Sequence, residues 1–170
     1  YADDPYRGFV PSTGRLVYYR EPDIGPGVRV DTGVYEGGDI SVHYDPMLAK
    51  LVTWGEDRIS AIHSMQRALG EFYIRGISHN IPFLASVLRH QNFQDGACTT
   101  EFVERCYPQG LVPAALPSAQ MDVMACVAAF IHRLRMERDA LLPGQAKGFE
   151  RDIGEDLVVC FSGTVYVDVR

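Results

Sequence analysis

The stretch that decides the fold class is MLAKLVTWGEDRISAIHSMQRALGEF, residues 47–72. Its first part, 47–54, is a nearly continuous run of apolar side chains, which predicts a strand buried on both faces. The apolar spacing then changes to three and four residues, which predicts an amphipathic helix. The apolar stripe of that helix is formed by Ile59, Ile62, Met65, Leu69 and Phe72. A strand followed directly by such a helix indicates strands and helices packed in one domain.

Local signals set the limits of this helix and of two further ones. Asp57 stands at the start of the first helix, where the positive end of the helix dipole favours a carboxylate. Gly76 is predicted to end it. A second helix is predicted to begin after Asn80, a good N-cap residue. A third, shorter helix is predicted from 99–100 to just before Tyr107.

Two more strands are predicted upstream of the deciding stretch. Residues 15–19 are rich in β-branched and aromatic side chains, with turn residues on both sides. Residues 28–34 alternate apolar and polar side chains, the period of a half-buried strand. The fold class predicted for residues 1–107 is therefore α+β, an antiparallel sheet with packed helices.

A second unit is predicted beyond the proline-rich segment 108–117, which is interpreted as a linker. Residues 118–170 are predicted to hold a long helix that starts at Ser118, followed by strands at 156–161 and 164–169. The apolar stripe of that helix is formed by Met124, Val127, Phe130, Ile131 and Leu134. Ser162-Gly163 is predicted to join the two strands as a hairpin turn. A lone hairpin is marginal in water, so this second unit is expected to be truncated.

Composition excludes several classes of function. The net charge of −6 argues against a nucleic-acid surface, which needs clustered lysines and arginines. No apolar run is long enough to span a membrane, and no signal peptide is visible. The four cysteines form no CxxC pair, and we expect buried or half-buried thiols in a reducing compartment, the cytoplasm or an organelle matrix. The absence of a starting methionine suggests a fragment.

The search for catalytic motifs is negative. No phosphate-binding glycine loop, HExxH or GxSxG is present, so no catalytic and no metal-binding residue is predicted. Two loop features allow two interpretations each. Phe9 is either folded back on the core or offers a flat face to a ligand ring. Tyr44 and Asp45 either form the turn that starts a strand or stand at the rim of a site.

Read together, six segments carry a family resemblance. They are 2–14 (ADDPYRGFVPSTG), 27–34 (GVRVDTGV), 44–51 (YDPMLAKL), 58–69 (RISAIHSMQRAL), 75–81 (RGISHNI) and 93–102 (FQDGACTTEF). In this order they resemble the C-terminal domain of the biotin carboxylase unit of biotin-dependent acyl-CoA carboxylases, from residue 1 to about 107. The sequences of residues 4–9 and 107–110 resemble those of the alpha subunits of the propionyl-CoA type. Residues 118–170 resemble the start of the subunit-joining domain of that family, in which a long helix precedes a β-barrel.

The resemblance implies a ligase reaction, in which biotin is carboxylated by bicarbonate with ATP and Mg²⁺. The family's ATP-grasp domain and its biotinyl-lysine segment have no counterpart in these 170 residues. We therefore expect a fragment that has no activity alone and binds no cofactor. Partners implied by the resemblance are the carboxyltransferase beta subunit, the biotin carboxyl carrier domain and the ATP-grasp part of the same subunit. The implied location is the bacterial cytoplasm or the mitochondrial matrix.

The resemblance also assigns site residues. Phe9 matches the aromatic residue beside biotin, and Arg29, Tyr44 and Asp45 match positions at the rim of the biotin site or near a subunit contact. The competing hypotheses are a non-enzymatic α+β interaction module and an inactive carboxylase paralogue. The acyl-CoA substrate is a property of the carboxyltransferase partner and is not fixed by these residues.

Overall fold

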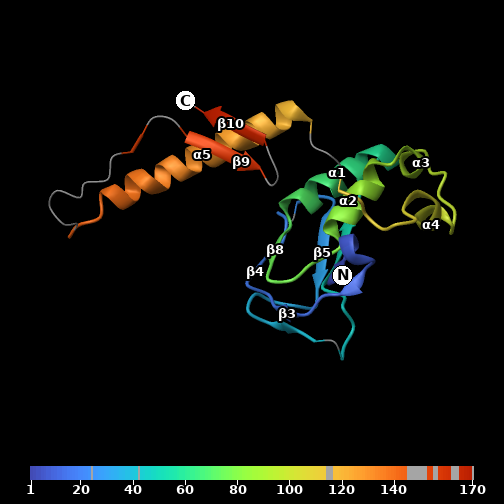
Figure 1. Ribbon diagram of the computed structural model, residues 1–170. Coiled ribbons are helices and arrows are strands. Elements are labelled where there is room, and N and C mark those ends of the chain that lie inside the picture. The colour runs from blue at the N-terminus through green and yellow to red at the C-terminus, as the bar shows by residue number, and fades with distance from the viewer. Residues whose placement is uncertain are drawn as a thin grey trace. The chain divides into compact units, whose positions relative to one another are not determined.

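The chain folds into two compact units, residues 1–113 and 114–170. A computed structural model describes residues 1–23, 25–41, 43–113, 117–144, 153–154, 157–161 and 165–169. The boundary between the units falls inside the segment 108–117 that the sequence predicts as a linker. Figure 1 shows helices α1 and α2 side by side over the strands of the first unit.

The strands of the first unit form antiparallel pairs, as the predicted fold class requires. The pairs are β1 (Asp3–Asp4) with β2 (Val10–Pro11), β3 (Gly14–Arg15) with β6 (Asp39–Ile40), β4 (Tyr18–Arg20) with β8 (Tyr73–Arg75), and β5 (Val28–Thr32) with β7 (Ala49–Thr53). The longest pair is β5–β7, in which Val30 lies opposite Leu51. The α+β fold class is therefore confirmed.

Helix α1 (Arg58–Glu71) begins where the sequence predicts it. The carboxylate of Asp57 accepts a hydrogen bond from the backbone N–H of Ser60 at 2.7 Å, which satisfies one of the free donors of the first turn. Ile62 and Leu69 are buried, but Ile59, predicted on the same stripe, is 44% exposed. The buried face of α1 therefore starts one turn later than the periodicity suggests.

The predicted strand at 15–19 is interrupted. Leu16 and Val17 separate β3 from β4, and Leu16 is fully buried between the two short strands. Its backbone N–H donates to the carbonyl of Gly38 at 2.9 Å, whereas Val17 donates to Arg75 at 2.8 Å. The stretch 15–19 thus changes its strand partner at one residue. The strand propensity of its residues does not reveal such a change.

Strand β7 is not buried on both faces, contrary to the prediction. Ala49, Leu51 and Thr53 are half-buried, whereas Lys50 and Val52 are exposed. Helix α1 covers the first of these faces. The continuous apolar run therefore describes a strand with one covered face and one open face.

Gly76 does not end α1, which stops at Glu71. The chain forms strand β8 first, and Gly76 follows that strand with φ of 109°. A side chain there would collide with the backbone of the β3–β4 segment, because a built Cβ lies 2.0 Å from the carbonyl oxygen of Arg15. The glycine allows β8 and the β3–β4 segment to approach closely.

The other helices of the first unit are short. They are α2 (Ile81–Arg89), α3 (Gln91–Gln94) and α4 (Phe102–Cys106). Asn80 precedes α2 as predicted, but its side chain makes no capping bond. Helix α3 has no counterpart in the prediction, and α4 begins two to three residues later than expected.

The second unit contains α5 (Ser118–Ala140) and the antiparallel hairpin strands β9 (Leu157–Phe161) and β10 (Val165–Val169), which contact α5. The predicted hairpin turn Ser162-Gly163 lies outside the described residues. The buried residues of α5 are Ala125 and Ala129, not the predicted stripe. That stripe is 46–62% exposed at Met124, Val127, Phe130, Ile131 and Leu134. The buried residues of α5 are thus small alanines, and the large apolar side chains of the predicted stripe stay exposed.

Candidate functional site

Phe9, the predicted biotin contact, lies at the end of a tight turn. Asp4 caps the 3-10 helix η1 (Pro5–Arg7) by accepting a hydrogen bond from the N–H of Tyr6 at 3.0 Å. Gly8 and Phe9 then both have positive φ, 68° and 60°. For a bulky residue such as phenylalanine this conformation is uncommon, so the turn is held by its surroundings. One such contact is the bond from the N–H of Phe9 to the carbonyl of Asp4 at 2.8 Å.

The ring of Phe9 belongs to an aromatic cluster on α2. It meets the ring of Phe83 edge to face, with centroids 4.8 Å apart. Phe83 meets Tyr107 in the same way at 5.0 Å, and the hydroxyl of Tyr107 is 2.9 Å from that of Ser86. Phe9 is therefore folded back on the domain, and its half-buried ring keeps a partly open surface.

Tyr44 and Asp45 lie in the turn that leads to β7. Asp45 accepts a hydrogen bond from the N–H of Met47 at 2.9 Å, the pattern of a turn-forming aspartate. Tyr44 is 83% exposed. Both residues thus have the geometry of the turn-forming alternative, and their role at a site rim stays a prediction.

Arg29 projects from β5 into solvent. Its Nε lies 3.3 Å from Oδ1 of Asp31, and the two side chains are 69% and 52% exposed. An ion pair this exposed contributes little to stability. Arg29 is therefore available for a contact outside this domain.

The structure does not assemble the four predicted residues into one centre. No hydrogen bond, ion pair or ring contact of the described residues joins Phe9 to Arg29, Tyr44 or Asp45. Nor do the described residues contain a group of three histidine, cysteine, aspartate or glutamate side chains that could hold a metal ion. The prediction of buried or half-buried thiols is wrong for Cys98, Cys126 and Cys160, which are exposed, and Cys106 is intermediate.

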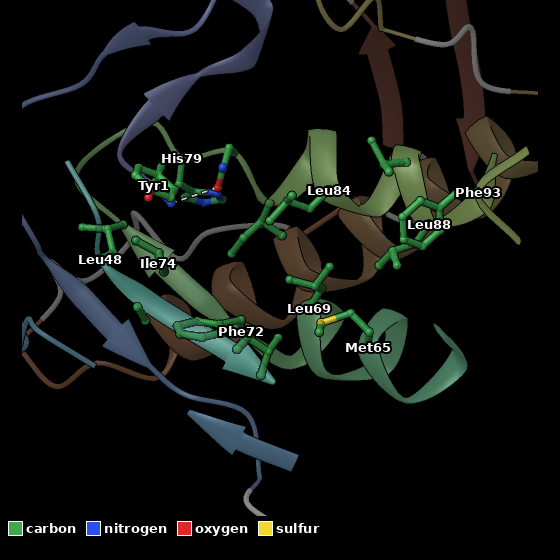
Figure 2. Close-up of a pocket in the computed structure, with 15 residues that line it drawn as sticks. Tyr1, Leu48, Met65, Leu69, Phe72, Ile74, His79, Leu84, Leu88 and Phe93 are labelled. Atoms are coloured by element: carbon green, nitrogen blue, oxygen red, sulfur yellow. Dashed lines mark hydrogen bonds between the residues drawn. The ribbon is translucent and has the colours of Figure 1, made fainter. Parts of the chain in front are cut away.

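Sequence reasoning missed a cavity of about 300 Å³ in the first unit. Figure 2 shows its lining, which comes from β7, β8, α1 and α2 and is almost entirely apolar. Members of the lining include Leu48, Ala49, Leu51, Met65, Leu69, Phe72, Ile74, Leu84, Leu88 and Phe93. No sequence motif marks the cavity, because its walls carry the periodicity of an ordinary core.

His79 is a polar exception in that lining. Its Nδ1 is buried and has no hydrogen-bond partner among the described residues, which is costly for a polar atom. Burial lowers the pKa of the imidazole below its ordinary value, so the folded state favours the neutral ring. The only hint in the sequence is the position of His79 directly before the predicted helix cap Asn80.

We expect His79 to make stability depend on pH. In the unfolded chain the imidazole takes up a proton near pH 6.5, whereas the folded state resists protonation. The free energy of unfolding should therefore fall as the pH is lowered from about 7.5 through 6.5. Urea unfolding of the parent and of His79→Gln at several pH values checks this. Equal pH slopes for the parent and for His79→Gln would contradict the expectation.

Known proteins are similar to this chain over most of its length. Residues 1–105 match the family model "Biotin carboxylase C-terminal domain". The chain is 43% identical, over 96% of its length, to the propionyl-CoA carboxylase alpha chain of Ruegeria pomeroyi, and 43% identical over 81% to the mitochondrial one of Mus musculus. It is 46% identical over 62% to the methylcrotonoyl-CoA carboxylase subunit alpha of Oryza sativa. The chain spans 27%, 20% and 14% of these relatives.

Solved structures agree on the fold. The biotin carboxylase domain of the Hydrogenobacter thermophilus 2-oxoglutarate carboxylase matches with a TM-score of 0.62 at 34% identity, over 67% of this chain and 25% of that one. The biotin carboxylase of Campylobacter jejuni matches with a TM-score of 0.58 at 35% identity, over 61% and 23%. In the part of the chain that the structure describes, no helix is long and apolar enough to cross a membrane. On the match of residues 1–105, this chain belongs to the biotin carboxylase C-terminal domain family.

Proposed function

We propose that this chain is part of the alpha subunit of a biotin-dependent propionyl-CoA carboxylase. In that reaction ATP and Mg²⁺ activate bicarbonate, biotin is carboxylated, and the carboxyl group passes to an acyl-CoA. The observation that carries the proposal is the family match of residues 1–105 together with the antiparallel α+β fold. The proposed location follows from relatives that are bacterial or mitochondrial.

The propionyl-CoA type is favoured by how far the matches extend. The methylcrotonoyl-CoA relative matches over 105 residues, whereas the propionyl-CoA relatives match over 130 to 182 residues. The longer matches therefore include part of the second unit, in which α5 leaves a row of large apolar side chains exposed. Such a row supports a role for this unit in contacts with other parts of the enzyme, the carboxyltransferase beta subunit among them.

The residues of this chain fit a positioning role better than a catalytic one. The Hydrogenobacter structure is described as a complex with MgADP, ADP and bicarbonate. The described residues here offer no group of metal-binding side chains, so no step with ATP or Mg²⁺ is placed on them. Phe9 would contact biotin through the open part of its ring, and Arg29, Tyr44 and Asp45 would lie at the rim or at a subunit contact.

The proposed role of Phe9 predicts a selective kinetic effect. In the complete subunit, Phe9→Ala should raise the KM for free biotin several-fold and leave the KM for ATP nearly unchanged, because only the biotin contact is lost. Steady-state kinetics with free biotin measure both. Tyr6→Ala, an exposed change in the same turn, is the matched control. An unchanged KM for biotin, or an equal rise in both constants, would argue against a biotin contact.

The proposed activity is tested by reconstitution. This chain is combined with the N-terminal part of the same gene product, and ATP hydrolysis that depends on bicarbonate and free biotin is measured. We expect hydrolysis from the combination and none from either part alone, and calorimetry should detect no ATP binding by this chain. The control is the chain with Gly76→Ala, which should not fold. After addition of the beta subunit and the carrier domain, propionyl-CoA should be carboxylated faster than acetyl-CoA.

The same experiment separates the competing hypotheses. A non-enzymatic interaction module or an inactive paralogue would bind its partners without any hydrolysis that depends on bicarbonate. Binding is followed separately by sedimentation of the mixture. Assembly without activity would therefore replace the carboxylase proposal with one of these two.

A further inference from the structure

Residues 107–111, near the end of the first unit, pack against the turn that carries Phe9. The Phe9 turn comprises residues 4–9. The N–H of Leu111 donates a hydrogen bond to the carbonyl of Pro5 in this turn at 3.1 Å. The side chain of Pro5 is fully buried, so the bond is made at a well-anchored point of the turn. Two segments that are distant in sequence are thus joined through their backbones.

Gly110 allows this close approach. It has φ of 74°, and its N–H donates to the carbonyl of Tyr107 at 3.0 Å, which closes a turn in the segment 107–111. A Cβ built on Gly110 lies 3.1 Å from the carbonyl oxygen of Pro5. A side chain would therefore press on the same oxygen that accepts the bond from Leu111. The segment can contact the Phe9 turn in this way only because residue 110 has no side chain.

Tyr107 reaches the Phe9 turn by a second route, through ring contacts. Its ring meets that of Phe83 edge to face with centroids 5.0 Å apart, and Phe83 meets Phe9 in the same way at 4.8 Å. The ring of Tyr107 also lies 6.3 Å from that of the buried Phe102, and its hydroxyl is 2.9 Å from that of Ser86. Tyr107 is therefore fixed in place, and it supports Phe83 where Phe83 contacts Phe9.

The backbone of Phe9 needs such support. A φ of 60° is uncommon for a bulky residue, and such conformations persist only where the surrounding structure fixes them. Within the turn, the N–H of Phe9 donates to the carbonyl of Asp4 at 2.8 Å. From outside the turn, the contacts at Pro5 and at Phe83 both lead to the segment 107–111.

We propose that the segment 107–111 positions the ring of Phe9 for its contact with biotin. Tyr107 acts through Phe83, and Leu111 acts through the backbone of the Phe9 turn. The inference rests on the proposed function for the biotin contact itself. An aromatic face that is ordered before the ligand arrives binds more tightly, because no ordering cost is subtracted from the binding free energy. Tyr107 and Leu111 are therefore positioning residues and not catalytic ones.

Steady-state kinetics of the complete subunit with free biotin test the proposal. Tyr107→Ala removes the ring behind Phe83, and it should raise the KM for biotin about threefold or more and leave that for ATP nearly unchanged. Tyr107→Phe keeps the ring and should hold the KM for biotin within about twofold of the parent. Gly110→Ala should raise the same constant by the other route. Gln109→Ala, an exposed change in the same segment, is the matched control.

A double variant decides whether Tyr107 acts through Phe9. In the Phe9→Ala background, Tyr107→Ala should change the KM for biotin little, because the ring that it positions is already absent. Effects that multiply in the double variant would overturn the inference. So would an unchanged KM for biotin in Tyr107→Ala, or an equal rise of the constants for biotin and ATP.

Amide exchange of the full 170-residue chain, followed by NMR, tests the positioning without catalysis. The N–H of Phe9 should exchange about tenfold faster in Tyr107→Ala and in Gly110→Ala, because a turn with less support opens more often. Gln109→Ala should leave this rate unchanged. Equal exchange of the Phe9 N–H in the parent and in Tyr107→Ala would overturn the inference.

Failure of this inference and failure of the proposed function are distinguishable. An unchanged KM for biotin in Phe9→Ala would overturn the biotin contact, and amide exchange at Phe9 would then decide by itself whether the segment 107–111 positions the ring. A raised KM for biotin in Phe9→Ala together with an unchanged one in Tyr107→Ala would overturn the positioning alone.

Discussion

Replacing Gly76 with alanine should prevent the first unit from folding. Gly76 has φ of 109°, a region that side chains of the L configuration rarely enter. The added Cβ would lie 2.0 Å from the carbonyl oxygen of Arg15 and 2.9 Å from the nitrogen of Val17. Both are backbone atoms, so no rotamer change relieves the contact. Strain and collision together should cost at least about 4 kcal/mol of unfolding free energy.

Gly70 provides the matched control for that experiment. It lies within α1, its φ is in the ordinary range, and a Cβ built on it meets nothing within 4 Å. Gly70→Ala should therefore raise the free energy of unfolding by about 0.5–1 kcal/mol, through helix propensity and the smaller entropy of the unfolded chain. Urea unfolding followed by the fluorescence of Trp54, which lies in the first unit, compares the variants. Similar stability of Gly76→Ala and the parent would refute the close-approach argument.

Local chemistry predicted the parts of the fold that depend on neighbouring residues. The alternation at 28–34 marks β5, and Asp57 marks the start of α1 because a carboxylate satisfies the first free N–H groups of a helix. The hairpin strands β9 and β10 were predicted from the same kind of pattern. In each case the signal and its cause lie within a few residues of one another.

Features that depend on distant partners were not predicted. Leu16 interrupts a strand because its two sides bond to different segments, around Gly38 and Arg75. Strand β8 follows α1 without a turn motif and is fixed by pairing with β4. In α5 the apolar period correctly indicated a helix but selected the wrong face, since Ala125 and Ala129 are buried whereas the large apolar side chains are exposed.

The candidate site also depends on contacts between residues that are distant in sequence. Resemblance selected Phe9, but its contact with Phe83 joins a turn to a helix that is distant in sequence, and no periodicity predicts such a pair. The cavity of the first unit was hidden for the opposite reason. Its walls carry the apolar periodicity of an ordinary core, so no residue pattern distinguishes them.

Leu16→Ala should be the second most damaging change. Leu16 is fully buried and packs in a cluster with Ala2, Leu48 and Ile74. Truncation removes apolar surface from the core and leaves a cavity, at a cost of about 2–5 kcal/mol. The position suggests the upper part of that range, because strands that change partner at Leu16 cannot easily close around the void. Urea unfolding measures the lost free energy of unfolding. The midpoint concentration of urea should fall, and the dependence of the free energy on urea concentration should stay the same.

Replacement of the neighbouring Val17 is the control that distinguishes loss of a buried side chain from disruption of the strand as the cause of destabilisation. Val17 lies in the same interruption between β3 and β4, but its side chain is 56% exposed. Val17→Ala should therefore change the free energy of unfolding by no more than about 0.5 kcal/mol. Losses of similar size at both positions would show that the backbone path, rather than the buried cluster, determines stability here. A large loss at Leu16 alone places the core of this unit at the point where its short strands change partners.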